Sequence, residues 1–232
     1  MDHARYDKRR YPIVGVREGY AEWSRTYEQT VHDEMDLRLL ERLRTVDWAS
    51  ARAVLDLACG TGRIGVWLRQ RCPDAAIDGV DLTPEMLAHA DKTGVYRTVR
   101  VADVAATGLP TAAYAVCTQA LADEHLAELA PLYREASRVI RPGGVFVLVG
   151  YHPYFLMAGV PTHFDRAPGE SITIRSYVHL PSEHVAAAHA AGFTLAEMDE
   201  GLVDDAWLQK KPKWREYAGL PVSFSMVWRR GQ

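Results

Sequence analysis

The chain has 232 residues, of which 48% are apolar and 25% are charged, and its formal net charge is -3. These values are typical of a soluble globular protein with a substantial core, and they argue against a generally basic nucleic-acid coat. No apolar run is long enough to span a membrane, and the N-terminus lacks the apolar core of a signal peptide, so we expect a cytoplasmic protein. The three scattered cysteines include no Cys-x-x-Cys pair and are expected to be free thiols.

Residues 1–50 are expected to be mostly helical and to form an N-terminal cap, or lid. Tyr20, Trp23 and Tyr27 follow one another at spacings of three and four, so they share one helix face. This aromatic face either closes over a bound ligand or packs the cap onto the rest of the protein, and both roles stay open.

From residue 50 onward, short apolar and β-branched runs alternate with longer amphipathic stretches. Strands are expected at 53–58, 76–80, 95–101, 113–118 and 145–149. Helices are expected at 63–71, from Thr83 onward and at 123–140. This alternation predicts a parallel sheet with helices on both faces.

The last third of the chain departs from this alternation. Residues 151–180 form a long connection with an alternating segment at 171–178, and we expect an insertion over the active site. One helix and two strands are then expected at 181–191, 194–198 and 222–228. All these elements together predict a single domain that spans residues 1–232.

A glycine-rich loop joins the first expected strand to the first expected helix after it. Its glycines, Gly60, Gly62 and Gly65, have the spacing G-x-G-x-x-G. Glycine lets the backbone approach a ligand closely, and free N–H groups at a helix start favour anionic or polar ligand groups. The same spacing occurs in dinucleotide-binding sites, so a nicotinamide or flavin enzyme is one alternative.

Three aspartates stand at or just past three successive strands: Asp56, Asp81 and Asp103. The carboxyl ends of parallel strands meet at one crevice, where such sheets bind ligands. There Asp81 can accept hydrogen bonds from two ribose hydroxyls, and Asp103 can accept one from an adenine amine. The sequence therefore predicts a nucleoside-containing ligand.

Four segments in order, VLDLACGTGRIGVWL, VDLTPEML, VADVAATGLP and RPGGVFVLVG, resemble the motifs of class I S-adenosylmethionine-dependent methyltransferases, of the small-molecule type 11/25-like group. The resemblance covers roughly residues 50–150. It implies an α/β, Rossmann-like seven-stranded sheet of order 3-2-1-4-5-7-6, with an antiparallel seventh strand at 221–229 and helices on both faces.

The resemblance also implies S-adenosylmethionine as cofactor and S-adenosylhomocysteine as product. Asp56 would order the glycine loop, Asp81 would hold the ribose, and Asp103 would bind the adenine amine. The full set of residues expected at the cofactor is Tyr20, Tyr27, Asp56, Ala58, Cys59, Gly60, Gly62, Asp81, Leu82, Met86, Asp103, Val104, Thr118 and Gln119.

Two histidines are candidates for a catalytic base, because histidine titrates near neutral pH. His125 follows the fourth strand and is the first candidate, and His152 follows the fifth strand and is the second. A helix-start histidine that faces solvent is the alternative for His125. His184 and His189 lie five residues apart, which is not the spacing of a two-histidine zinc site, so both are expected at the surface and no metal is expected.

The acceptor of the methyl group is expected to be a small molecule. The residues expected to bind it are Trp23, Tyr151, His163, Tyr177, His179 and Trp207. The segment at 204–214 carries three lysines and two tryptophans, which could bind an anion or nucleic acid, but a solvated loop pinned by Trp207 and Trp214 is favoured.

The predicted reaction is methyl transfer to oxygen, nitrogen or carbon, in that order. The residues after the fourth strand lack the [DN]-P-P-[YF] pattern of DNA amine methyltransferases, so nucleic acid is not expected as a partner. A cofactor-binding isomerase, cyclase or binding protein without net methyl transfer is one alternative, and a protein or RNA methyltransferase is another. Homodimer formation stays open.

Overall fold

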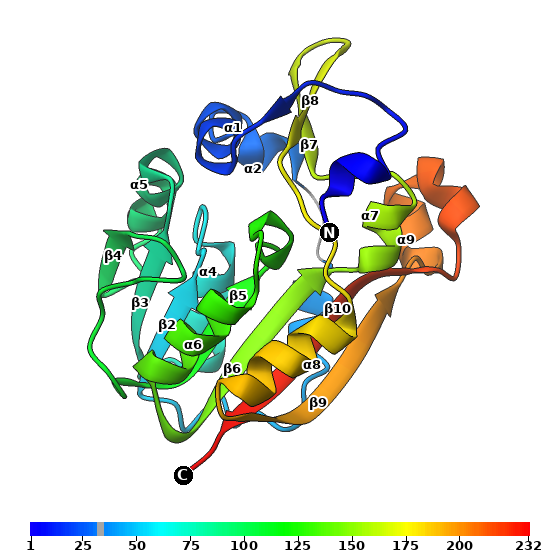
Figure 1. The fold of residues 1–232 in the computed structure, drawn as a ribbon. Coiled ribbons are helices and arrows are strands. Elements are labelled where there is room, and N and C mark those ends of the chain that lie inside the picture. Colours follow the sequence, from blue (N-terminus) through cyan, green and yellow to red (C-terminus); the bar gives the residue numbers. More distant parts are fainter. Residues whose placement is uncertain (32–34) are drawn as a thin grey trace.

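A seven-stranded sheet forms the centre of the computed structural model, which describes residues 1–31 and 35–232 (Figure 1). From one edge to the other its strands are β4 (Thr98–Val101), β3 (Ala76–Asp81), β2 (Ala53–Leu57), β5 (Tyr114–Ala120), β6 (Ile140–Tyr151), β10 (Pro221–Arg230) and β9 (Phe193–Leu202). β10 runs antiparallel to both β6 and β9, and the other neighbouring pairs are parallel. The expected strand order and the antiparallel seventh strand are confirmed.

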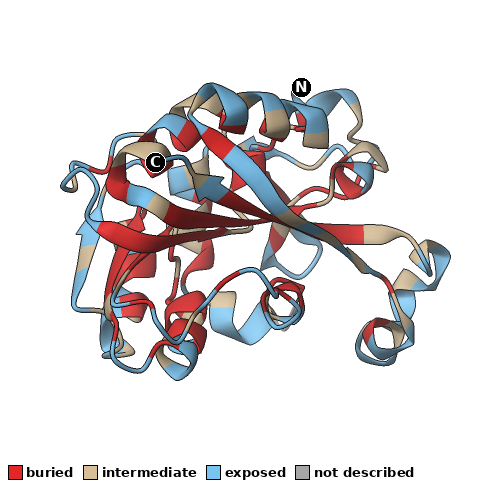
Figure 2. Cartoon of the chain, turned by 90° about the horizontal axis from the view of Figure 1, so that it is seen from below, coloured by how far each residue is buried: buried red, intermediate tan, exposed pale blue. Residues whose placement is uncertain are grey.

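Both faces of the sheet are buried, which explains its nearly continuous apolar strands. Along β6, Phe146 and Leu148 point into one core while Val147 and Val149 point into the other. The first core is covered by α6 (Ala130–Val139) and α8 (Pro181–Ala190), which lie in front of the sheet in Figure 1. The second is covered by α3 (Leu37–Leu40) and α4 (Arg63–Arg71). Figure 2 shows the buried residues concentrated along the central strands.

A second, three-stranded sheet lies above the main one, at the top of Figure 1. Its order is β1 (Ile13–Val14), β8 (Glu170–Ile174) and β7 (His163–Ala167), with β1 parallel to β8. Its neighbours are α1 (Val16–Trp23) and α2 (Tyr27–Thr30). We call this sheet and these two helices the lid, and it joins the N-terminal segment to the 151–180 connection.

The other elements flank the two sheets. α5 (Pro84–Lys92) packs along β3 and β4. The short elements are η1 (His3–Arg5), η2 (Asp123–His125), α7 (Pro153–Met157), α9 (Asp205–Lys210) and η3 (Pro212–Tyr217). No helix among the described residues is long and apolar enough to cross a membrane.

The expected helix at 123–140 is wrong in its first part. The chain instead makes the short turn η2, and α6 begins only at Ala130, with Pro131 in its first turn where proline is tolerated. Two interactions stabilise the earlier turn. When the Gln119 amide is oriented with its oxygen toward the turn, that oxygen accepts hydrogen bonds from the amides of Ala122 and Asp123 at 2.8 and 3.2 Å. These bonds replace helical ones.

Two other expectations also need correction. The N-terminal region is less helical than expected, because α1, α2 and α3 are short and β1 pairs with β8; its residues 32–34 lie outside the described part. His184 is fully buried on α8 and does not lie at the surface. Its Nδ1 lies 2.9 Å from the Tyr133 hydroxyl, and burial lowers the pKa of His184 to about 4.

Candidate active site

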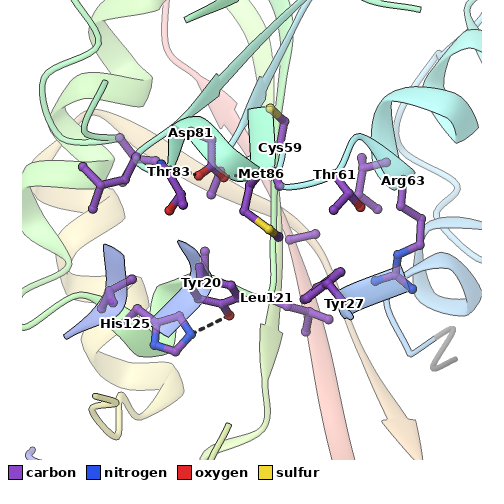
Figure 3. Close-up of a pocket in the computed structure, with 18 of the residues that line it drawn as sticks. Tyr20, Tyr27, Cys59, Thr61, Arg63, Asp81, Thr83, Met86, Leu121 and His125 are labelled. Carbon is purple, nitrogen blue, oxygen red and sulfur yellow. Dashed lines mark hydrogen bonds between the residues drawn. The ribbon is translucent and has the colours of Figure 1, made fainter. Parts of the chain in front are cut away.

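A cavity of about 230 Å³ lies at the carboxyl ends of β2, β3, β4 and β5. One wall comes from the sheet side, with Cys59, Asp81 and Met86, and the other comes from the lid and η2, with Tyr20 and His125 (Figure 3). The two walls face each other across the open space in Figure 3. The position matches the crevice that the strand-end aspartates predict.

The glycine loop approaches this cavity with an unusual backbone. Ala58, Gly60 and Gly62 have φ angles of 53°, 54° and 93°, all in the left-handed region that favours glycine. Gly62 directly precedes α4, and its own position offers no side chain to cap that helix, so the start of α4 suits a polar ligand group. Such a loop admits a polar ligand close to its main chain.

Asp81 is held firmly in the cavity wall. Its Oδ2 accepts a hydrogen bond from the Gly60 amide at 2.9 Å, and its Oδ1 accepts one from the Thr83 amide at 2.8 Å. Burial raises the pKa of Asp81, and these two hydrogen bonds partly oppose that rise. A carboxylate has about four lone-pair sites, so Asp81 keeps acceptor capacity for ligand hydroxyls.

Asp56 does not line the cavity but supports it from below. It is buried and accepts hydrogen bonds from the Tyr96 hydroxyl at 2.7 Å and the Thr118 hydroxyl at 2.9 Å. Burial is the main reason that its pKa is raised to about 7. The Tyr96 hydroxyl occupies the space of a side chain at Gly65, because a Cβ there would lie 2.2 Å from it. The third glycine therefore serves packing in this chain.

The sequence-predicted cofactor residues fall into two groups. Those that line the cavity are Tyr20, Tyr27, Ala58, Cys59, Gly60, Asp81, Leu82, Met86, Asp103 and Val104. Those that lie behind its wall are Asp56, Gly62, Thr118 and Gln119. Thr61, which belongs to the glycine loop expected along the cofactor, also lines the cavity. Sequence reasoning missed Thr83 and Arg63, and Arg63 lines the cavity and pairs with Asp36 at 2.5 Å. The position of Arg63 directly after Gly62, within the glycine motif, is the signal that could have found it.

His125 lies in the cavity wall and contacts the lid. Its Nδ1 lies 2.8 Å from the Arg175 carbonyl oxygen, and its Nε2 lies 2.9 Å from the Tyr20 hydroxyl (Figure 3). A carbonyl oxygen can only accept, so Nδ1 carries the proton and the Nε2 of neutral His125 accepts from Tyr20. His125 is buried, with 8% of the residue exposed, so the alternative of a solvent-facing histidine is wrong.

Glu124 is a further residue that sequence reasoning missed. It is 3% exposed, and its Oε1 lies 3.7 Å from the Nε2 of His125 and accepts the Thr162 hydroxyl at 3.3 Å. Its Oε2 has no hydrogen-bond partner among the described residues. Burial raises the pKa of Glu124, and His125 partly opposes that rise. Its place beside His125 in the sequence was the available signal.

A second cavity, of about 480 Å³, adjoins the first. Tyr20, Tyr27, Arg63 and Leu121 line both. Leu121 has a φ of 53°, so the chain turns sharply at the boundary between the two. The second cavity is large enough for a small organic molecule.

The sequence-predicted acceptor residues are divided by the structure. Trp23, Tyr151 and His163 line the second cavity. The other three, Tyr177, His179 and Trp207, do not. The Tyr177 amide donates to the Glu124 carbonyl at 2.6 Å, His179 Nε2 lies 2.6 Å from the Leu126 carbonyl, and Trp207 packs on Trp214 in an apolar cluster.

His152 lies outside both cavities, so the structure does not place the second candidate base at the site. Its Nδ1 accepts a hydrogen bond from the Tyr154 amide at 3.2 Å and so caps α7. Its Nε2 lies 3.4 Å from Glu200. Helix capping occupies the lone pair that a base would need.

The described residues fit an adenosyl ligand with a charged amino-acid end. Asp81 and Asp103 supply acceptors for hydroxyl and amine donors, and Arg63, which pairs with Asp36, has further N–H donors for a carboxylate. No group of three or more metal-ligating side chains is found in the described ranges.

Residues 54–144 match the family model described as "Methyltransferase domain". The demethylmenaquinone methyltransferase of Thermus thermophilus is 35% identical over 119 residues, which are 48% of this chain and 54% of that protein. The chain spans about half the length of the curated relatives it matches.

Solved structures share the fold over most of the chain. The S-adenosylmethionine-dependent methyltransferase from Mesorhizobium loti superimposes with a TM-score of 0.69 at 22% identity, covering 86% of this chain and 99% of its own. The [4+2]-cyclase SpnF superimposes with a TM-score of 0.66 at 17% identity, covering 95% and 98%. Residues 54–144 therefore resemble a methyltransferase domain, and the chain shares the α/β, Rossmann-like fold of solved S-adenosylmethionine-dependent methyltransferases.

Proposed function

We propose that this protein transfers a methyl group from S-adenosylmethionine to a small-molecule acceptor. The observation that carries the proposal is the junction of two cavities, one with the strand-end aspartates and one with room for a small molecule. When bound, the cofactor supplies an electrophilic methyl group on a sulfonium, so the protein's main task is alignment.

The sheet side of the site would hold the cofactor. Asp81 accepts hydrogen bonds from the ribose hydroxyls with the lone pairs that Gly60 and Thr83 leave free. Asp103 accepts from the adenine amine, and Arg63 pairs with the carboxylate end. Tyr20, Tyr27 and Leu121, which line both cavities, orient the acceptor atom toward the cofactor cavity and exclude water.

The Tyr20–His125 pair would remove the acceptor's proton. Burial raises the pKa of Tyr20 well above its usual value, so a free phenolate is unfavourable. Because the Tyr20 hydroxyl already donates to His125, its oxygen can take the proton of an acceptor hydroxyl or amine while its own proton passes to Nε2. Glu124, 3.7 Å from that nitrogen, stabilises the imidazolium.

This relay supports an O–H or N–H acceptor ahead of carbon. The name of the Thermus thermophilus relative, a demethylmenaquinone methyltransferase, supports a small organic molecule as the acceptor class.

The first test is calorimetric titration of the purified protein with S-adenosylmethionine, S-adenosylhomocysteine and NADH. We expect micromolar binding of the first two and none of NADH. Binding of NADH alone would replace the proposal with a dehydrogenase-like function.

The second test follows the methyl group. The protein is incubated with methyl-labelled S-adenosylmethionine and pools of small-molecule hydroxyl and amine compounds. Transfer of label to a product supports the proposal. Turnover of a compound with the label retained on the cofactor would instead show an isomerase or cyclase.

A further inference from the structure

The second cavity has two chemically different ends. Tyr20, Tyr27 and Leu121 form the end that it shares with the first cavity. Arg9, from the N-terminal segment, and Lys213, from η3, line only the second cavity. The two cations therefore line a part of the wall that the first cavity does not share.

Arg9 is held in place by a neutral imidazole. Its Nη1 lies 3.3 Å from His163 Nε2, and His163 Nδ1 lies 2.8 Å from the Pro161 carbonyl oxygen. The guanidinium has only donors and the carbonyl only accepts, so His163 accepts at Nε2 and donates at Nδ1. This hydrogen bond positions the cation without cancelling its charge.

Lys213 acts on the same ring. Burial is the main cause of the lowered pKa of His163, and the positive charges of Arg9 and Lys213 lower it further, against the opposing effects of the Pro161 carbonyl and Asp165. Two positive charges thus converge on one uncharged imidazole at the cavity wall.

The carboxylates around this end do not neutralise the two cations. Among the described residues, neither Arg9 nor Lys213 forms an ion pair. Asp165 and Glu216 also line the cavity, and Asp165 accepts the Ser171 hydroxyl at 2.5 Å. A third cation, Lys211, lies over the Trp214 ring at 5.1 Å from its centre. Among the described residues at this end, the cationic side chains are Arg9, Lys211 and Lys213, and the carboxylates are Asp165 and Glu216.

Aromatic side chains also line the second cavity. Trp23 and Phe164 stack with their ring centres 5.6 Å apart and their planes at 14°. Tyr27 packs on Trp23 at 4.8 Å, and Trp214 lines the wall beside Lys211. Such walls bind a flat or apolar body.

We propose that the methyl acceptor is an organic anion, with a carboxylate, sulfonate or phosphate that Arg9 and Lys213 bind and an apolar body that the aromatic wall holds. That the bound anion is the methyl acceptor rests on the proposed function. The binding of an anion at Arg9 and Lys213 does not depend on it. With the anionic group fixed at Arg9 and Lys213, the other end of the molecule is directed toward Tyr20 and Leu121.

A matched pair of fluorescent probes tests the site without an identified acceptor. Anilinonaphthalene sulfonate and phenylnaphthylamine have the same ring system, and only the first carries an anionic group. Each is titrated against the protein saturated with S-adenosylhomocysteine. We expect the sulfonate to bind about 10- to 100-fold more tightly, the gain that one charge-assisted hydrogen bond would give.

Two double variants test whether Arg9 and Lys213 cause the preference for the sulfonate probe. Arg9→Ala/Lys213→Ala should bind both probes equally. Lys8→Ala/Arg215→Ala removes the same charge from neighbouring residues that do not line the cavity, so it should keep the wild-type preference. Circular dichroism and S-adenosylhomocysteine binding check that each variant is folded.

Three results would overturn the inference: equal binding of the probes to the wild type, binding of neither probe, or a preference that survives in the Arg9/Lys213 variant. Cofactor binding is measured separately in the same samples. A protein that prefers the sulfonate but binds no S-adenosylmethionine would retain the anion site and lose the proposed function. A protein that binds S-adenosylmethionine but does not prefer the sulfonate would contradict only the anion site.

Discussion

The two cavities of this protein are built in different ways. The first is lined mainly by residues that directly follow neighbouring strands of one sheet, within about 100 consecutive residues. The second takes its walls from the N-terminal segment, the lid strand β7 and the η3 segment, which are far apart in the sequence.

This difference in construction matches the two proposed roles, cofactor binding in the first cavity and acceptor binding in the second. The first cavity lies at strand ends whose positions the sheet fixes, and proteins of 22% identity or less share this fold. The acceptor side depends on contacts between remote segments, which can change without altering the sheet. Variants on the two sides should therefore fail in different ways.

The largest effect is expected at the Tyr20–His125 pair, where the lid contacts η2. Tyr20→Phe and His125→Ala should each lower the rate of methyl transfer about 10²- to 10⁴-fold, because each breaks the proton relay. Cofactor affinity should change little. Single-turnover rates with an acceptor from the labelled screen, and calorimetry with S-adenosylmethionine, make the two measurements.

Tyr154→Phe is the matched control, because Tyr154 is exposed and lines neither cavity. A normal rate in Tyr20→Phe would assign the hydroxyl a packing role. Loss of cofactor affinity in both variants would show that the lid belongs to the cofactor site. The two cavities would then not differ in the way proposed.

On the sheet side, Asp81→Ala should mainly weaken cofactor binding. The loss of charge-assisted hydrogen bonds to a ribose is worth about 1.5–3 kcal/mol, which corresponds to roughly 10- to 100-fold in Kd. Calorimetry gives the affinity, and urea unfolding corrects for the two lost amide partners. Unchanged affinity in a folded variant would remove Asp81 from the cofactor site.

The sequence predicted the sheet side well for a physical reason. Strand ends and glycine turns are local features, so the positions of Asp81, Asp103 and Gly60 in one cavity wall follow from chain order alone. The short connections of a doubly wound sheet leave few alternative arrangements.

The lid side could not be predicted in the same way. Arg9 and His163 are 154 residues apart, and no local sequence pattern predicts their contact. Glu124 was missed because its burial comes from the lid, and His184 was misplaced because the apolar side of α8 could not be read from its run of alanines. His152 follows a strand as a site residue would, but its side chain turns to cap α7.

A smaller effect is expected from a substitution at Gly65, which packs against Tyr96 behind the first cavity. Gly65→Ala should lower the free energy of unfolding by about 1–3 kcal/mol, because the new Cβ collides with the Tyr96 hydroxyl that binds Asp56. In a double-mutant cycle measured by urea unfolding, Tyr96→Phe should cost less in the Gly65→Ala background than alone. Additive losses would contradict a direct collision.

The smallest effect concerns η2, where the two sides meet. Burial raises the pKa of Asp123 to about 7, so the folded chain keeps a proton that the unfolded chain releases above about pH 4. Stability from this group therefore falls as the pH rises toward 7. The lowered pKa of His184, 3.5 Å away, gives the opposite slope from about pH 4 to 6.5.

Asp123→Asn removes the contribution to the free energy of unfolding that falls as the pH rises. The contribution of His184 stays. The difference in unfolding free energy between variant and wild type should rise with pH across this window, by at most about 1.4 kcal/mol per pH unit. Urea unfolding at a series of pH values measures it, and the matching slope from Asp56 cancels because both proteins carry it. A constant difference would show that Asp123 is already ionised.

The pairing of β1 with β8 has a consequence for engineering. Ile13 faces Thr173 and Val14 faces Ile174 in this pair, so one small sheet is encoded in two distant stretches of the gene. A chimera that imports only residues 151–180 from a relative would carry one half of that sheet against a foreign partner. Exchange of acceptor preference between relatives therefore requires the grafting of both stretches together, even though the chain between them stays the same.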